Sequence, residues 1–160
     1  MISSEKALYL LNQLTIRSNW LILSHHKPDG DTLGCSSALY QVGKSLNKNI
    51  RWGGEDPYPE LYRFLPESNM YIQLEGLPRD LNGRETAIIC LDTSNVERSI
   101  PCLLKDRENA FLVNIDHHVD NEVYGDINII LPCSSTAEIL WSLFSFWGIR
   151  VSPGIATAIY

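Results

Sequence analysis

The chain has 160 residues, with 13 Lys and Arg against 19 Asp and Glu, and a formal charge of −6. A hydrophobic content of 44% excludes a disordered chain, and the length suffices for one domain with its own core. An acidic chain is a poor candidate for coating duplex DNA, although one focused site can still bind phosphate. The longest uncharged apolar run, 139–147, is far short of the ~20 residues that a membrane span needs.

The four cysteines, Cys35, Cys90, Cys102 and Cys133, form no C-x-x-C pair. A structural zinc site is therefore disfavoured, and reduced thiols are expected. The N-terminus lacks the basic and apolar regions of a signal peptide. We therefore expect a cytoplasmic protein that does not enter a membrane.

Apolar spacing predicts the secondary structure in chain order. We expect helices over 4–17 and 31–46, and strands over 20–24, 49–52, 86–91, 110–115 and 127–131. The segment 55–66 holds three prolines, which predicts a loop with one helical turn. Strands that alternate with helices indicate an α/β fold with a parallel, Rossmann-like sheet flanked by helices.

Two further helices are predicted near the C-terminus. Ser135 and Glu138 have the spacing of a capping box, which starts a helix that Gly148 ends. Pro153 then begins a helix that still runs at Tyr160. From this we expect the chain to be truncated at its C-terminus.

Acidic and imidazole side chains follow three of the predicted strands. The segments are 25–31 (HHKPDGD), 92–94 (DTS) and 116–118 (DHH). The carboxyl ends of neighbouring parallel strands form a ligand crevice, so these groups are expected to converge. Clustered carboxylates repel, and a divalent metal removes the conflict. Oxygen and imidazole ligands favour Mn²⁺, with Mg²⁺, Fe²⁺ or Co²⁺ as competitors, and two ions about 3.5–4 Å apart suit phosphoryl transfer.

Each segment also has a simpler interpretation. Pro28 to Asp31 forms a good turn with a helix N-cap, Asp92 alone is more typical of an N-cap, and paired histidines occur on surfaces. Turn chemistry does not explain why all three follow parallel strands.

The combination His25-x-x-Pro28-Asp29-Gly30-Asp31-x-x-Gly34, Asp92 and Asp116-His117-His118 resembles the first three motifs of the DHH phosphoesterases. The flanking sequence is similar to the branch of oligoribonucleases and 3′-phosphoadenosine-5′-phosphate phosphatases. The resemblance implies an Mn²⁺-dependent enzyme, with two ions, that cleaves short single-stranded RNA or a nucleotide phosphate.

The resemblance also implies roles for individual residues. His25 and Asp29 would bind one ion, Asp31 and His117 the second, and Asp92 would bridge both and take part in catalysis.

His118 would face the scissile phosphate as a catalytic donor or acid, and Asp116 would hold His117 in its tautomer. Ser134 and Ser135, at a helix N-terminus, are candidate phosphate-binding residues, although capping alone explains them equally well. Gly30 and Gly34 would permit close backbone approach.

The fourth family motif, an aspartate, and the C-terminal substrate-holding domain are not in this chain. Residues 1–160 are therefore expected to be a metal-binding domain with little activity alone. Whether the protein forms a homodimer is left open by the sequence. The alternatives are a cyclic-dinucleotide or other DHH phosphodiesterase and a non-catalytic nucleotide- or metal-binding module. A Rossmann dinucleotide site is disfavoured because no G-x-G-x-x-G follows the first strand.

Overall fold

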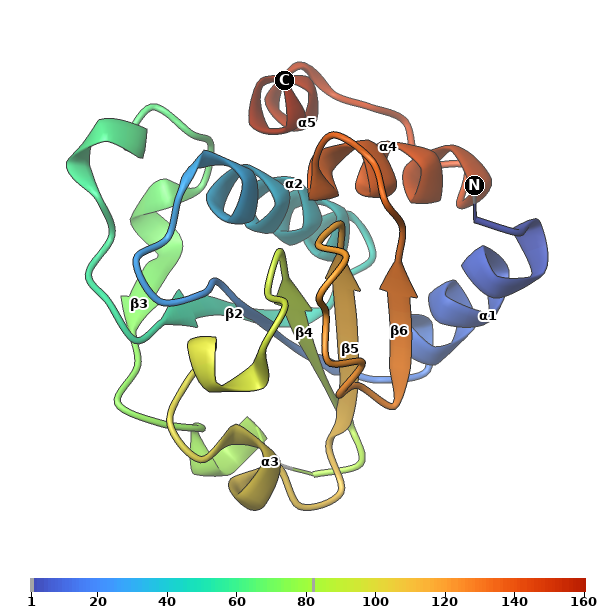
Figure 1. Cartoon of the computed structure of the whole chain (residues 1–160). Helices are drawn as coiled ribbons and strands as arrows, with labels where there is room; N and C mark the ends of the chain where they lie inside the picture. Colours follow the sequence, from blue (N-terminus) through green and yellow to red (C-terminus); the bar gives the residue numbers. More distant parts are fainter. Residues whose placement is uncertain (1, 82) are drawn as a thin grey trace.

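A single parallel sheet organises the computed structural model, which describes residues 2–81 and 83–160. The strand order is β3-β2-β1-β4-β5-β6, and every neighbouring pair is parallel (Figure 1). The strands are β1 (Asn19–Leu23), β2 (Asn49–Gly54), β3 (Tyr71–Gln73), β4 (Thr86–Leu91), β5 (Phe111–Asp116) and β6 (Ile127–Ile130). The predicted parallel α/β fold is confirmed.

Four helices confirm the sequence prediction to within two residues at each end. They are α1 (Ser4–Thr15), α2 (Gly30–Ser45), α4 (Thr136–Phe146) and α5 (Pro153–Ile159). The predicted start and stop signals of α4 are also present, because Ser135 Oγ accepts the Glu138 N–H and Gly148 has φ +64°. The Glu138 carboxylate, however, bonds Ser134 instead of closing the box on the Ser135 amide.

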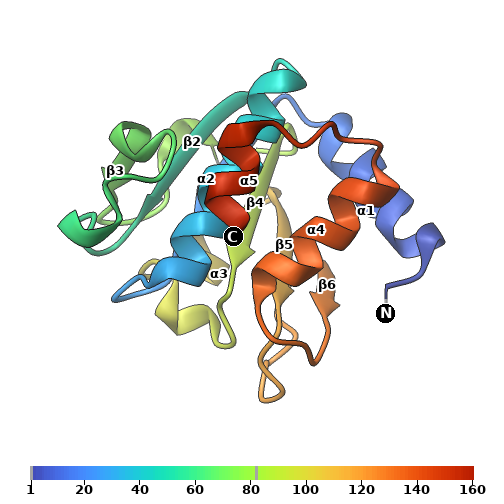
Figure 2. The same ribbon diagram turned by 90° about the horizontal axis from the view of Figure 1, so that it is seen from above.

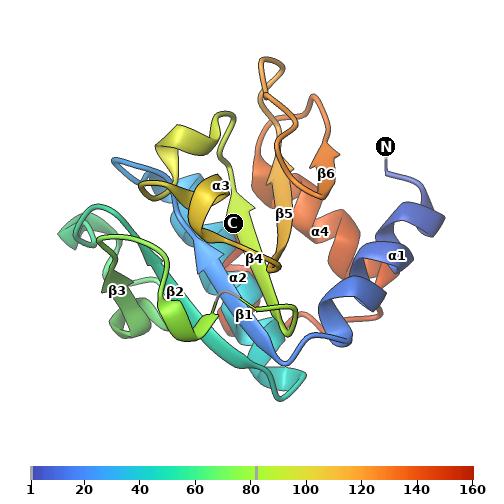
Figure 3. The ribbon, with the colours of Figure 1, turned by 90° about the horizontal axis from the view of Figure 1, so that it is seen from below.

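Helices cover one face of the sheet. Figures 2 and 3 show α1, α2, α4 and α5 on the same side, with α5 lying over α2. Buried side chains from the sheet and these helices form the larger core, which includes Trp20, Trp52, Leu39, Leu140 and Phe144. This layer fixes the positions of the α2 and α4 N-termini relative to the strand ends.

The opposite face has a thinner cover. A smaller core there includes Leu21, Leu23, Ile88 and Leu112 from the strands, packed under Leu81, Ile100 and Leu103. The cover consists of α3 (Leu103–Asp106) and 3₁₀ turns at Arg79–Leu81 and Val96–Arg98. The sheet is thus asymmetric, with helices on one side and short turns on the other.

The structure adds elements that the sequence pattern did not predict. β3 and α3 have three and four residues, too few for a periodic signal. The predicted loop at 55–66 does hold one helical turn, Glu60–Tyr62, and a second follows at Ser68–Met70. Within the described residues, no helix combines the length and apolar character needed to cross a membrane.

Gly34 lies where α2 and α5 touch. A Cβ built on Gly34 would overlap the carbonyl oxygen of Ala158. At Gly30, a Cβ would lie 3.2 Å from the Tyr62 ring. The expectation of close backbone approach therefore holds at Gly34, whereas a side chain covers Gly30.

Candidate metal centre

The predicted site residues follow three adjacent strands. His25 lies two residues after β1, Asp92 directly after β4, and His117 and His118 directly after β5. β1 pairs with β4 and β4 with β5, so these strand ends are neighbours (Figure 1). The other two predicted ligands, Asp29 and Asp31, lie at the N-terminus of α2.

His25, Asp29 and Asp92 form one group of potential ligands. His25 Nε2 is 3.7 Å from Asp29 Oδ1 and 3.6 Å from Asp92 Oδ2. The other ring nitrogen, Nδ1, lies 2.8 Å from the His26 carbonyl oxygen, which places a proton on Nδ1 and directs Nε2 toward the carboxylates. Burial alone would lower the pKa of His25, but the contacts with Asp29 and Asp92 raise it to about 9.

Asp29 is both a helix cap and a potential ligand. Its Oδ1 accepts the backbone N–H groups of Asp31 and Thr32 at 3.0 and 3.3 Å. The contact with His25 is the main cause that lowers the pKa of Asp29 to about 2, and the two backbone bonds add to it. The capping interpretation of this segment is thus correct, and it leaves the carboxylate facing His25.

Asp92 also belongs to a second group, with His117 and His118. Asp92 Oδ1 is 3.5 Å from His117 Nε2 and 3.7 Å from His118 Nδ1. His117 Nε2 is also 3.9 Å from Asp31 Oδ2. Asp92 therefore uses its two oxygens to face two groups of potential ligands.

Asp31, at the N-terminus of α2, caps the neighbouring helix α4. Its Oδ2 accepts the Thr136 N–H at 2.8 Å, and its Oδ1 accepts the Ala137 N–H at 3.1 Å. Burial is the main cause that raises the pKa of Asp31, and the charge of Asp92 adds to it. The first-turn amides of α4 thus donate to Asp31 and Ser135, which favours capping over phosphate binding for Ser134 and Ser135.

The role predicted for Asp116 is wrong in one respect. Asp116 is fully buried, and its Oδ1 bonds the ring of His118 at 2.7 Å, not the ring of His117. The partner of His117 Nδ1 is the Cys133 carbonyl oxygen at 3.1 Å. Asp116 instead accepts the His117 backbone N–H at 2.8 Å, and Asn121 donates to its second oxygen. A backbone carbonyl from a distant loop therefore orients His117.

His118 is half-exposed beside this carboxylate network. Burial alone would lower its pKa, but the hydrogen bond to Asp116 and the charges of Asp116, Asp92 and Asp120 raise it. The bond to Asp116 uses Nδ1, so Nε2 is the nitrogen left for another partner.

Two features of the site were not predicted. Thr136, fully buried, donates its hydroxyl to Asp92 Oδ1 at 2.9 Å, and Asn121 ties Asp116 to the Thr93 carbonyl. The capping-box pattern could have predicted that Thr136 begins the helix. Nothing in the sequence predicts that its hydroxyl contacts Asp92. Asp92 itself has φ +59°, a strained conformation for a non-glycine residue and one that clusters at functional sites.

The donor chemistry of the cluster fits a divalent cation. Carboxylate oxygens and imidazole nitrogens from five predicted residues face one another, and thiolates are not among them. Burial and the charge of Asp92 raise the pKa of the Asp31 carboxyl, and a bound cation would offset the repulsion between the two groups. The residues present can therefore hold metal.

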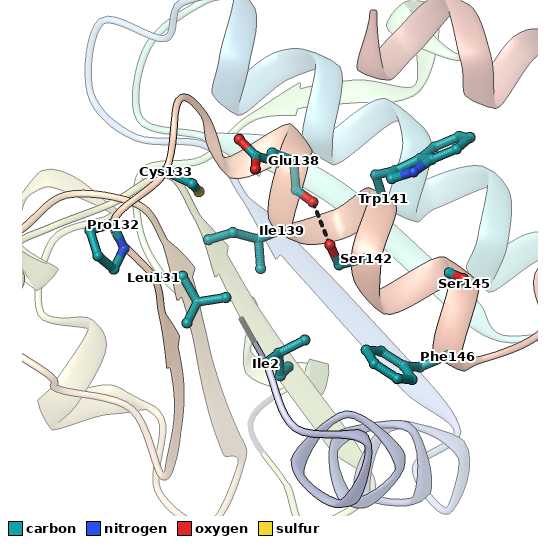
Figure 4. Close-up of a pocket in the computed structure, with 10 residues that line it drawn as sticks. All are labelled: Ile2, Leu131, Pro132, Cys133, Glu138, Ile139, Trp141, Ser142, Ser145 and Phe146. Atoms are coloured by element: carbon teal, nitrogen blue, oxygen red, sulfur yellow. Dashed lines mark hydrogen bonds between the residues drawn. The ribbon is translucent and has the colours of Figure 1, made fainter.

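A groove lined by apolar and polar side chains lies apart from this cluster. It runs between the end of β6 and α4, and Ile2, Leu131, Ile139 and Phe146 point into it (Figure 4). None of the candidate metal ligands lines it.

Comparison with known proteins decides the family. The model of the DHH family, N-terminal domain, matches residues 19–160, which includes every candidate ligand. The chain belongs to the DHH family.

Two curated relatives of this chain are named as bifunctional enzymes. It is 31% identical over 140 residues to the bifunctional oligoribonuclease and PAP phosphatase NrnA of Thermus thermophilus. It is 28% identical over 147 residues to a probable bifunctional oligoribonuclease and PAP phosphatase NrnA of Streptococcus mutans. The matches cover 86% and 88% of the chain but only 40% and 43% of those relatives.

A solved structure shares the DHH architecture. The crystal structure of an exopolyphosphatase-related protein from Bacteroides fragilis matches all of this chain and 49% of its own, with a TM-score of 0.90 and 25% identity. The chain thus spans less than half the length of the relatives and of the structure described here.

Proposed function

We propose that the chain is the metal-binding domain of a phosphoesterase that hydrolyses short oligoribonucleotides, 3′-phosphoadenosine-5′-phosphate, or both. The observation that carries the proposal is the position of Asp92, whose two oxygens face two separate groups of ligands. A carboxylate shared in this way suits a pair of Mn²⁺ ions. The names of the Thermus and Streptococcus relatives support the choice of substrates.

In this proposal His25 and Asp29 hold one ion, Asp31 and His117 hold the other, and Asp92 bridges them. Bound divalent ions would polarise a phosphoryl oxygen and make water a better nucleophile. The chain's own contribution is preorganisation. The hydrogen bond that His118 Nδ1 donates to Asp116 holds the ring so that its Nε2 can donate to a phosphoryl oxygen of the substrate.

Substrate selection is proposed to lie largely outside residues 1–160. Positioning of reactants can lower the activation barrier by about 7–11 kcal/mol. A metal-binding domain that does not position the substrate should therefore hydrolyse it slowly. We therefore propose that the chain alone has little activity.

Hydrolysis assays test this function. A dinucleotide, 3′-phosphoadenosine-5′-phosphate and a cyclic dinucleotide are incubated with Mn²⁺ and either this chain or the longest polypeptide that its gene encodes. We expect the longest polypeptide to cleave one or both of the first two substrates. Asp92→Asn should abolish cleavage, and Asp80→Asn, which removes an exposed carboxylate paired with Arg51, should not.

Other outcomes separate the alternatives. Cleavage of the cyclic dinucleotide alone would identify a different branch of the family. Mn²⁺ binding without cleavage of any substrate would favour the non-catalytic module, and failure to bind Mn²⁺ would contradict the metal centre itself.

A further inference from the structure

Arg98 places a positive charge directly beside the candidate ligand His25. Its Nη2 atom lies 3.5 Å from His25 Nδ1. Arg98 ends the 3₁₀ turn Val96–Arg98, and its carbonyl oxygen accepts the His26 N–H at 2.6 Å. This backbone bond fixes the turn against the loop that carries His25.

The donors of the Arg98 guanidinium are not used by this contact. Arginine can only donate, and His25 Nδ1 already directs its proton to the His26 carbonyl, so the 3.5 Å approach is not a hydrogen bond. Arg51, Arg63 and Arg107 each pair with a carboxylate. Arg98 forms no such ion pair within residues 2–81 and 83–160.

The charge of Arg98 acts on any cation that His25 holds. A guanidinium stays charged at all physiological pH values, and it repels a divalent cation held on the same imidazole ring. An anion that contacts the guanidinium reverses the sign of that interaction. The planar donor fork of arginine matches the oxygens of phosphate, so phosphate is the anion that the arrangement fits.

The orientation of His25 indicates that a phosphate bound by Arg98 would not be the one at the candidate metal position. Nε2 faces Asp29 and Asp92, whereas Nδ1, beside Arg98, faces the His26 carbonyl. Arg98 therefore approaches the edge of the ring that does not face the candidate metal position. We infer that Arg98 binds a second, uncleaved phosphate of the substrate, so that the site prefers nucleotides with two phosphates. This inference rests on the proposed function.

The test compares two ligands that differ by one phosphate. Binding of 3′-phosphoadenosine-5′-phosphate and of adenosine 3′-monophosphate, which lacks the phosphate that is not cleaved, is measured by calorimetry at saturating Mn²⁺. The proteins are the longest polypeptide that the gene encodes, which holds the unmodified chain, and its variants Arg98→Gln, Arg98→Lys and the control Arg150→Gln. Arg150 is an exposed arginine in the connection from α4 to α5, beyond the end of α4 opposite the candidate ligands. The ligand recovered from each titration is analysed by chromatography to detect cleavage. Where the bisphosphate is cleaved, the ratio of the kcat/KM values for the two ligands replaces the ratio of their affinities.

Loss of one charge-assisted contact should weaken bisphosphate binding by Arg98→Gln about ten- to a hundred-fold. Monophosphate binding should be unchanged, and Mn²⁺ affinity should not fall, because Arg98→Gln removes a positive charge beside His25. Arg98→Lys should retain part of the preference, and Arg150→Gln should behave as the unmodified chain. Equal weakening of both ligands, or no weakening, would overturn the inference. Failure of the unmodified chain to bind Mn²⁺ would instead refute the proposed function, so the two failures are distinguishable.

Discussion

Thr136 Oγ1 donates a 2.9 Å hydrogen bond to Asp92 Oδ1, and both side chains are buried. The backbone N–H of the same threonine donates to Asp31 at 2.8 Å. One residue at the start of α4 therefore holds two carboxylates from different elements, one in the first turn of α2 and one directly after β4. The relative positions of Asp31 and Asp92 are set by the fold before a cation binds.

Replacing Thr136 by valine should lower the free energy of unfolding by about 1–3 kcal/mol, because a buried carboxylate oxygen loses its donor while the shape is kept. Urea denaturation in the presence of a chelator measures the change. Thr157→Val is the matched control, since Thr157 is exposed and its hydroxyl bonds only the Pro153 carbonyl in its own helix. Its effect should stay within about 0.5 kcal/mol. Equal effects of the two substitutions would contradict a special role for Thr136.

The sheet, the four longer helices and the convergence of the site follow from the sequence because each rests on a repeated signal. Buried strands such as Thr86–Leu91 are continuous apolar runs, and α4 carries its own start and stop residues. Parallel pairing then brings the residues after β1, β4 and β5 to one edge without further information.

The finer contacts of the site depend on tertiary structure and could not be predicted. The carbonyl that orients His117 belongs to Cys133, and a carbonyl is common to every residue type. The cap of α4 comes from Asp31, which is 105 residues away along the chain from Thr136. β3 has only three residues, two of them exposed, so its alternation carries no signal.

Mn²⁺ should raise the melting temperature of the chain, because a ligand that binds only the native state stabilises it, by about 2.7 kcal/mol at a hundredfold excess over Kd. Asp92→Asn should remove this gain. Asparagine is the substitution of choice because it tolerates the positive φ of Asp92. Differential scanning calorimetry with and without Mn²⁺ measures the effect, and Asp80→Asn should keep the full gain. A gain that survives Asp92→Asn would show that the ions bind elsewhere.

Gly34→Ala should destabilise the chain, although alanine is more favourable than glycine in a helix by about 1 kcal/mol. The new Cβ would overlap the Ala158 carbonyl, and overpacking of this kind costs about 1–3 kcal/mol. Chemical denaturation gives the sign of the change. The control is Gly76→Ala, where a Cβ meets nothing within 4 Å. Stabilisation by Gly34→Ala would mean that α5 can move away from α2 without loss.

Asp126 should make stability depend on pH in the acid range. Burial alone would raise the pKa of Asp126, but hydrogen bonds from Arg107 and Leu112 lower it. A carboxyl whose pKa is lower in the folded state stabilises the fold above the unfolded value near 4, and this contribution disappears as the pH falls through the folded value. Its size should be below about 1 kcal/mol, because the side chain is 36% exposed and solvent screens it.

Unfolding of the unmodified chain and of Asp126→Asn from pH 3 to pH 7 checks this expectation. The difference between their free energies of unfolding should grow between about pH 3 and pH 5 and then level off. A constant difference across the range would show that the ion pair with Arg107 does not lower the carboxyl pKa.

The unequal cover of the two sheet faces has a consequence for how the molecule opens. Amides beneath the turns at Arg79–Leu81 and Val96–Arg98 are held by fewer buried side chains than those beneath α2 and α4. Local openings with low free energy should therefore begin on the turn side, and hydrogen exchange there should be faster than under the helices. Since the turn Val96–Arg98 is bonded to the loop of His25, such openings would loosen one wall of the candidate metal centre while the helical layer stays folded. Exchange at the His26 amide would report the frequency of this event.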